Sequence, residues 1–245
     1  MTETVRDGAL DLLLGGVCVG CGRPGRLVCP VCLAELPEGA APAWPTPTPA
    51  GLVVPWAASA YAGTVRAMVL GLKERGLLGL ASPLARLLAA AVACDLPRGR
   101  PVVLVPVPSR PATVRARGHD PTHTITARAA RGLTRGGLDV EVRRLLRQRS
   151  GVLDQAGLDA AGRAVNLSGS MRVSETAVRR SRLRLRRVRL VVCDDVLTTG
   201  STAREAQRAL EEAGLEVIRV ATVAATLRRD RAGTTPGTTP GLWSS

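Results

Sequence analysis

The sequence is poor in aromatic residues, with no phenylalanine, one tyrosine and three tryptophans among 245 residues. It also lacks any apolar run of the roughly 20 residues needed to span a bilayer. Residues 10–17 are apolar, but acidic residues flank them where a signal peptide has a basic segment. These absences exclude a transmembrane helix and predict a cytoplasmic location.

Lysine is nearly absent as well: Lys73 is the only one among 34 basic residues, and the net charge is +14. Such a charge favours anionic partners, either phosphates or nucleic acid. Because arginine replaces lysine everywhere else, the retained lysine suggests a need for a compact ammonium, with chance survival as the alternative. Histidine is scarce too, and a metal site at His119 and His123 is the less favoured interpretation of their spacing.

The chain divides into four segments by composition. Residues 1–36 hold a short predicted helix over 1–16 and a cysteine cluster, and residues 37–55 are proline-rich, which predicts an extended linker without regular structure. Residues 56–228 alternate predicted strands and helices. Residues 229–245 are of low complexity, which is typical of a disordered tail.

The alternation within 56–228 predicts an α/β domain with a parallel sheet. We expect strands over 101–107, 138–146, 189–194 and 215–226, with a short strand or turn over 56–64. We expect helices over 64–74, 77–94, 119–132, 155–165 and 201–213, and a basic loop over 113–118. Ligands of such sheets bind at the carboxyl ends of the strands.

One of these strand ends carries the most informative pattern in the chain, over residues 190–202. An apolar run ends in Asp194 and Asp195, and a loop of hydroxyl residues and glycine leads into a helix. Backbone N–H groups and the helix dipole attract a phosphate there, while paired carboxylates accept hydrogen bonds from ribose hydroxyls or hold a ligand-bound metal. The loop residues are Thr198, Thr199, Gly200, Ser201 and Thr202. The structural alternative is a plain helix cap. No G-K-[ST] sequence is present, which excludes a nucleotide P-loop.

Two further segments supply possible partners for an anion. The strand over 101–107 ends at Val107 and Pro108, where the prolines stiffen the turn. Arg110, Arg115 and Arg117 follow, and arginine binds phosphate through a planar fork. The run 179–189 contains seven arginines, which fits either a solvated basic face or contact with a nucleic-acid backbone, but no aromatic residue is interleaved for base stacking.

Four cysteines form two C-x-x-C pairs: Cys18 with Cys21, and Cys29 with Cys32. Four thiolates at this spacing suit a tetrahedral zinc ion in a closed, structural site. A redox dithiol or an iron–sulfur centre is the alternative. Cys94 and Cys193 lie in apolar surroundings and are interpreted as small hydrophobic residues.

Taken in order, these motifs resemble the ComF (competence protein F) family, a group of phosphoribosyltransferase-like proteins. The run 190–202 fills every fixed position of the phosphoribosyl pyrophosphate (PRPP) pattern D-D-x-x-T-T-G-x-T. The four-Cys module, Tyr61, the stretch 72–76, the turn at 105–108, the basic loop and the segment 155–166 precede it in the family order. One departure is the sequence at 117–121, R-G-H-D-P, where the family often has R-G-F-N-Q.

The resemblance implies a type I phosphoribosyltransferase fold with an N-terminal zinc finger. It implies that Asp194 and Asp195 meet the ribose hydroxyls and that residues 198–202 cradle the 5′-phosphate. Val107 and Pro108 would lie near the pyrophosphate, and Mg²⁺ would arrive bound to PRPP. The implied cationic partners are Lys73, Arg115 and Arg117. The family is linked to natural transformation, so the resemblance also implies a role in DNA uptake.

Three functions stay open at this point. The chain is a phosphoribosyltransferase with an unknown acceptor, or a non-catalytic PRPP sensor, or an accessory protein that processes single-stranded DNA through the zinc module and the arginine-rich segment.

Overall fold

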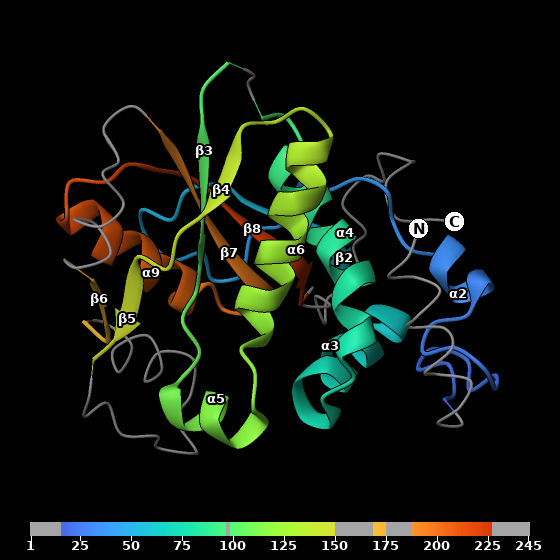
Figure 1. Cartoon of the computed structure of the whole chain (residues 1–245). Helices are drawn as coiled ribbons and strands as arrows, with labels where there is room; N and C mark the ends of the chain where they lie inside the picture. The colour runs from blue at the N-terminus through green and yellow to red at the C-terminus, as the bar shows by residue number, and fades with distance from the viewer. Residues whose placement is uncertain (1–15, 97–98, 150–168, 175–187, 227–245) are drawn as a thin grey trace.

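The structure, a computed structural model, describes residues 16–96, 99–149, 169–174 and 188–226 (Figure 1). Several predictions therefore lie outside the described residues. They are the helices over 1–16 and 155–165, the tail over 229–245, and the arginine run over 179–189 except its last two residues.

A six-stranded sheet in the order β1-β2-β8-β7-β3-β4 lies at the centre of the fold. Its strands are β1 (Ala41–Pro42), β2 (Pro55–Ala60), β3 (Val102–Pro106), β4 (Val140–Val142), β7 (Arg189–Leu197) and β8 (Val217–Ala225). Neighbouring strands run parallel, except that β1 is antiparallel to β2. A separate antiparallel pair is formed by β5 (Leu146–Gln148) and β6 (Met171–Val173). The predicted α/β class with a mostly parallel sheet is confirmed.

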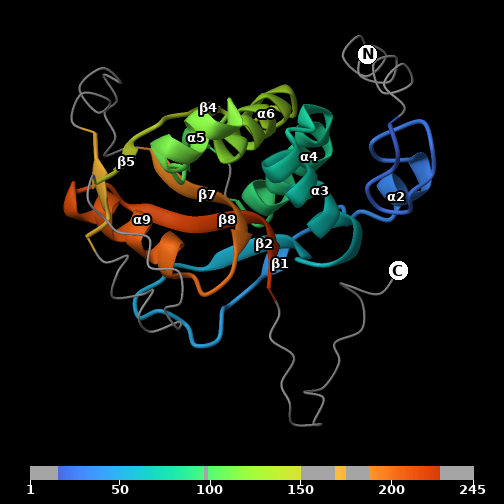
Figure 2. The same cartoon turned by 90° about the horizontal axis from the view of Figure 1, so that it is seen from below.

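Helices cover both faces of the sheet (Figure 2). On one side lie α3 (Gly63–Arg75), the 3₁₀ turn η1 (Leu78–Leu80), α4 (Ala81–Ala93) and α6 (Pro121–Arg135), and on the other lies α9 (Ser201–Glu212). Side chains of a strand alternate between the two faces. In β3, Val102 and Leu104 accordingly pack with the α4 and α6 side, while Val103 and Val105 pack with α9.

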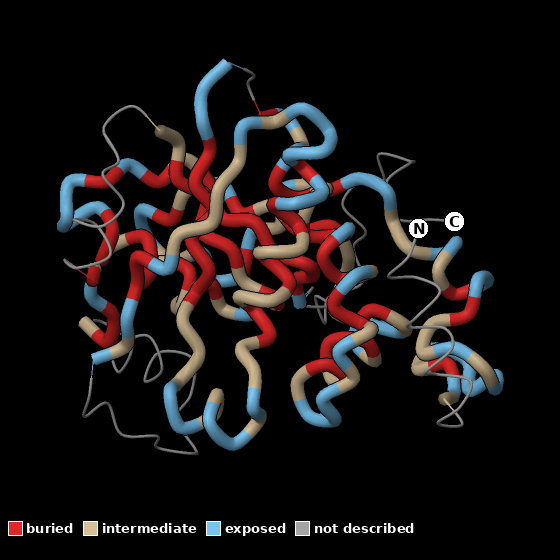
Figure 3. Tube along the Cα trace, in the orientation of Figure 1, coloured by how far each residue is buried: buried red, intermediate tan, exposed pale blue. Residues whose placement is uncertain are grey.

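The buried residues follow this layering, and Figure 3 shows them concentrated along the central strands. Buried residues of α4 recur three or four positions apart, which gives the helix one apolar face. No helix in the described ranges is long and apolar enough to cross a membrane.

Helix ends follow ordinary capping chemistry. Asp120 caps α6 by accepting a hydrogen bond from the His123 N–H at 3.2 Å, and Pro121 occupies the first turn. Gly76 ends α3 in the left-handed conformation, at φ 65°. Gly214 follows α9 at φ 73°, as expected for a residue just past the end of a helix.

Several elements differ from the prediction. The strand expected to end at Asp194 continues to Leu197, because β7 stays paired with β8 over that length. The basic loop over 113–118 is a helix, α5 (Pro111–Arg117), started by a proline and ended by Gly118 in the left-handed conformation. The strand expected over 138–146 is only the short β4. His119 precedes α6 and does not share a helix face with His123.

The proline-rich segment 37–55 is not a free linker, so the expectation of no regular structure there is wrong. Its residues 41–42 form β1, and Leu52 is buried on the α9 side of the sheet. Gln207 of α9, which is 1% exposed, accepts a hydrogen bond from the Val53 N–H at 3.0 Å and donates one to the Gly51 carbonyl at 2.9 Å. The segment is therefore fixed to α9 by hydrogen bonds from its backbone to the Gln207 side chain, as well as by apolar contact.

Candidate functional site

The carboxyl ends of four strands meet at one edge of the sheet. The N–H of Val107, just after β3, donates to the Cys193 carbonyl of β7 at 2.9 Å. The N–H of Tyr61, just after β2, donates to Ala225 of β8 at 2.8 Å. These bonds hold the turn after β3 and the residue after β2 beside the acidic pair of β7. Sequence-distant motifs are thus brought together by parallel pairing.

A cavity of about 400 Å³ opens at this edge. Nine of its lining residues were singled out in the sequence as possible ligand contacts: Lys73, Val107, Pro108, Arg110, Arg117, Asp194, Asp195, Thr198 and Thr202. The other five lining residues are Tyr61, Ser109, Thr113, Thr122 and Val196. The cavity is therefore lined by both carboxylates and cations, a combination that suits a ligand carrying hydroxyls and anionic groups.

Lys73 pairs directly with one member of the acidic pair. Its Nζ lies 2.5 Å from Oδ2 of Asp195, and the two side chains are 29% and 5% exposed. Lys73 reaches the cavity because it lies in the last turn of α3. The Asp195 N–H donates to Oδ1 of Asp194 at 2.9 Å, which fixes the first carboxylate against the backbone.

The surroundings of Asp194 and Lys73 shift the pKa of both side chains. Burial, and next the charge of Asp195, raise the pKa of Asp194 to about 7. Burial lowers the pKa of Lys73, but the charge and hydrogen bond of Asp195 outweigh it, so the pKa of Lys73 is raised overall. Lys73 is therefore an ammonium at neutral pH, whereas Asp194 exchanges a proton in that range.

The loop 198–200 leads into the N-terminus of α9, where backbone N–H groups are free to bind an anion in most helices. Oγ1 of Thr199 and Oγ of Ser201 are 3.0 Å apart. Gly200 has φ 75°, and a Cβ there would lie 2.9 Å from Cγ of Pro45. The proline-rich segment therefore packs against the outside of this loop and leaves room only for glycine.

The helix α5 supplies one arginine to the cavity and leaves another outside it. Arg117 lines the cavity and donates to Oε1 of Glu74 at 2.7 Å, while Arg115 is exposed and lies outside the lining. His119 has Nδ1 3.1 Å from the Arg117 carbonyl and Nε2 3.1 Å from the Leu72 carbonyl. His119 thus joins the ends of α3 and α5 at the position where the ComF pattern differs.

The four cysteines form a compact cluster. Their Sγ atoms all lie within 4.8 Å of one another, and Cys21 Sγ is 3.6 Å from Cys29 Sγ. A tetrahedral ion with metal–sulfur bonds of about 2.3 Å sets its ligands about 3.8 Å apart, so the donor set fits a metal ion such as zinc. Cys29 also caps the short helix α2 (Pro30–Ala34), and its N–H donates to Cys18 Sγ at 3.3 Å.

The four-Cys module, residues 16–36, packs against the start of α3. Figure 2 shows α2 beside α3 and outside the sheet. A Cβ on Gly20 would lie 2.7 Å from Oγ1 of Thr64 and 2.9 Å from Cys32 Sγ. A Cβ on Gly79 would lie 3.1 Å from Leu27. The module therefore rests on the same helix that carries Lys73 at its other end.

Some predicted residues lie outside the cavity, and some lining residues were not predicted. Thr199, Gly200 and Ser201 form the adjacent loop and helix start and do not line the cavity. Thr113 and Thr122 were not predicted because they lie on α5 and α6. Which residues of these two helices reach the cavity depends on where α5 ends and α6 begins. Tyr61 carried a signal in the sequence, as the only tyrosine of the chain.

The comparisons agree with this geometry. A family model described as "Phosphoribosyl transferase domain" matches residues 144–236, a range that includes β7, the loop 198–200, α9 and β8. No curated protein matches the chain. With a mostly parallel sheet and an acidic pair at its carboxyl edge, the chain carries a phosphoribosyltransferase-like domain next to a four-Cys cluster that can hold a metal ion.

Proposed function

We propose that the chain binds PRPP as its magnesium complex in the cavity at the carboxyl edge of the sheet. Asp194 and Asp195 accept hydrogen bonds from the ribose hydroxyls, and the loop 198–202 with the start of α9 holds the 5′-phosphate. Val107 and Pro108 lie beside the pyrophosphate, with Lys73 and the α5 arginines as its cations. The observation that carries the proposal is that these separate motifs line or adjoin one cavity.

The reaction we propose is transfer of the phosphoribosyl group to a nitrogen nucleophile. The C1–O bond breaks, its electron pair leaves with pyrophosphate, the new C1–N bond forms, and the nitrogen loses a proton. Positive charge develops at C1 in an oxocarbenium-like state, which fixed carboxylates stabilise electrostatically. When bound, Mg²⁺ neutralises charge on the leaving pyrophosphate; the chain's own residues position the sugar.

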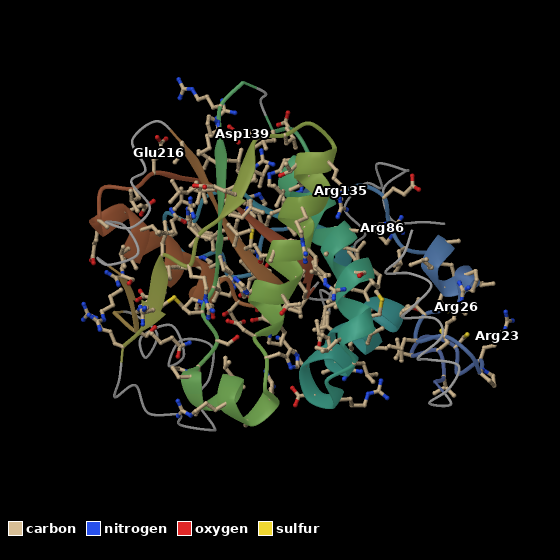
Figure 4. The ribbon with its side chains drawn as sticks, in the orientation of Figure 1. Arg23, Arg26, Arg86, Arg135, Asp139 and Glu216 are labelled. Atoms are coloured by element: carbon tan, nitrogen blue, oxygen red, sulfur yellow. The ribbon has the colours of Figure 1, made fainter. Side chains whose placement is uncertain are left out.

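Isothermal calorimetry with PRPP and Mg²⁺ tests the binding step. We expect saturable heat from the unaltered protein and an affinity about tenfold to a hundredfold lower for Asp195→Asn, because a charge-assisted hydrogen bond contributes about 1.5–3 kcal/mol. Arg86→Met is the control: Arg86 is exposed on α4, outside the cavity lining (Figure 4). Absence of heat from the unaltered protein would rule out the proposal.

Pyrophosphate release separates a transferase from a PRPP sensor. A transferase releases pyrophosphate only when a suitable nitrogen acceptor is added, whereas a sensor binds PRPP with the same affinity and releases none. A screen of metabolite mixtures for PRPP-dependent release, followed by mass spectrometry of the product, identifies the acceptor.

The resemblance to the ComF family extends the proposal to a zinc-binding, cytoplasmic protein of natural transformation that contacts single-stranded DNA. Supporting it are the pairing of the four-Cys module with the PRPP pattern and the exposed Arg23 and Arg26 at the outer edge of that module (Figure 4). Fluorescence anisotropy with a single-stranded oligonucleotide is expected to show binding that weakens as salt rises. We expect Arg23→Met with Arg26→Met to reduce it several-fold; binding unaffected by salt would contradict this contact.

A further inference from the structure

Lys73 forms an ion pair with a carboxylate that the proposed function assigns to the ligand. Its Nζ is 2.5 Å from Oδ2 of Asp195, and the Asp195 side chain is 5% exposed. The titratable groups that act on the ammonium are the two carboxylates of β7 and Tyr61 after β2, all of which line the same cavity. The carboxylate of Asp195 is therefore already paired with a positive charge of the chain itself.

Arg117, another cation of the cavity, does not pair with the acidic residues of β7. Arg117 pairs with Glu74, whose side chain is 58% exposed, so its charge is directed away from the acidic pair. Lys73 is also the only lysine in the sequence. An ammonium is a compact point charge on a flexible stem, and it can change partners over a few ångströms where a planar guanidinium needs a matched fork.

We propose that Lys73 is a built-in counter-ion that makes the acidic pair reject a free divalent cation and frees Asp195 only when a ligand with anionic groups enters the cavity. A bare cation at Asp195 must displace the ammonium and leave it partly buried beside a second positive charge, which is unfavourable. A ligand that carries a diphosphate gives the ammonium a new partner as it leaves Asp195. This second step rests on the proposed function; the exclusion of free cations does not.

Binding of Mn²⁺ alone, measured by electron paramagnetic resonance at about pH 8, tests the exclusion. We expect the unaltered protein to bind weakly and Lys73→Met to bind on the order of tenfold to a hundredfold more tightly, a range typical of coupled sites. Arg117→Met is the matched control, because it removes the same charge from the same cavity without touching Asp195. Adding Asp195→Asn to Lys73→Met should abolish the gain.

The proposal is overturned if Lys73→Met binds Mn²⁺ no more tightly than the unaltered protein. It is equally overturned if Arg117→Met produces the same gain, since the effect would then be the summed charge of the cavity and not the ion pair. Circular dichroism confirms that each variant is folded before titration.

A second measurement needs no variant. Because the chain has a single lysine, protein labelled with ¹³C-lysine gives one Cε resonance from it. We expect this resonance to stay unchanged with millimolar Mg²⁺ and to shift when PRPP is added with Mg²⁺. A shift with Mg²⁺ alone contradicts the exclusion. Exclusion of Mg²⁺ together with no response to PRPP supports the counter-ion and contradicts the proposed function, so the two failures are distinguishable.

Discussion

At about pH 8, Asp194→Asn is expected to stabilise the protein by about 1–3 kcal/mol, although it removes a residue proposed to bind the ligand. Burial and the neighbouring Asp195 charge raise the pKa of Asp194 to about 7, so at higher pH the fold holds a charge that it disfavours. An asparagine keeps the shape of the side chain and removes that charge.

The sign of this expected change in stability follows from how the free energy of unfolding depends on pH. A carboxyl group whose pKa is raised by folding binds its proton more tightly in the folded state, so the free energy of unfolding falls as pH rises. For Asp194 this fall lies between about pH 4, the ordinary value for a carboxyl group, and about pH 7, its value in the fold. Urea denaturation at pH 5 and pH 8 should show the fall in the unaltered protein and a smaller one in Asp194→Asn.

Asp195→Asn is the matched control, with the opposite expected sign. It removes the carboxylate that pairs with Lys73 and leaves a half-buried ammonium without its partner, which should cost about 2–4 kcal/mol. Equal effects of the two substitutions on stability would mean that the carboxylates share one environment, contrary to the contacts seen here. Both variants should bind PRPP more weakly, so the more stable of the two is also impaired in function.

Loss of the metal is expected to unfold the four-Cys module while the sheet persists. Structural zinc sites contribute apparent binding free energies of about 10–16 kcal/mol, and a module of this size has little core of its own. Its apolar core is the cysteines themselves, with Val28 against them. We therefore expect Cys29→Ser to lose bound zinc and to exchange amide hydrogens rapidly over residues 16–36.

Elemental analysis and hydrogen exchange measured by mass spectrometry check this expectation. The unaltered protein should carry one zinc ion per chain and protect the module from exchange. Cys94→Ser is the control, because Cys94 lies outside the cluster and contacts the Ala40 carbonyl. A metal-free protein with a protected module would contradict a structural role for the ion. Exchange at the first turn of α3 should rise as well, since Gly20 packs against Thr64.

Much of the parallel core could be predicted from the sequence, because local signals there agree with the final fold. The apolar runs of β3, β7 and β8 are buried strands, and α6 begins at Asp120 and Pro121 as its capping pattern predicts. The acidic pair and the loop 198–202 could be singled out because their spacing is specific, and their roles stay predictions.

What the sequence did not reveal depends on contacts between distant segments. The pairing of Lys73 with Asp195 joins residues 122 positions apart because the last turn of α3 lies at the carboxyl end of β7, and no local pattern encodes it. The helix α5 was not predicted because a segment of arginines that begins with a proline is as compatible with a loop as with a helix. The strand β1 is two residues long and is fixed by pairing with β2 alone, so composition favoured a linker.

The path of residues 37–55 sets a limit on how this protein can be divided. After the four-Cys module, the segment forms the edge strand β1, and Pro45 then packs against Gly200. Before β2 begins, its backbone forms hydrogen bonds with the side chain of Gln207. The cluster of cysteines and the cavity at the carboxyl edge of the sheet are therefore not independent parts joined by a free linker. An insertion or deletion within residues 37–55 would disturb the loop before α9 and also the attachment of the four-Cys module, so neither part can be exchanged without affecting the other.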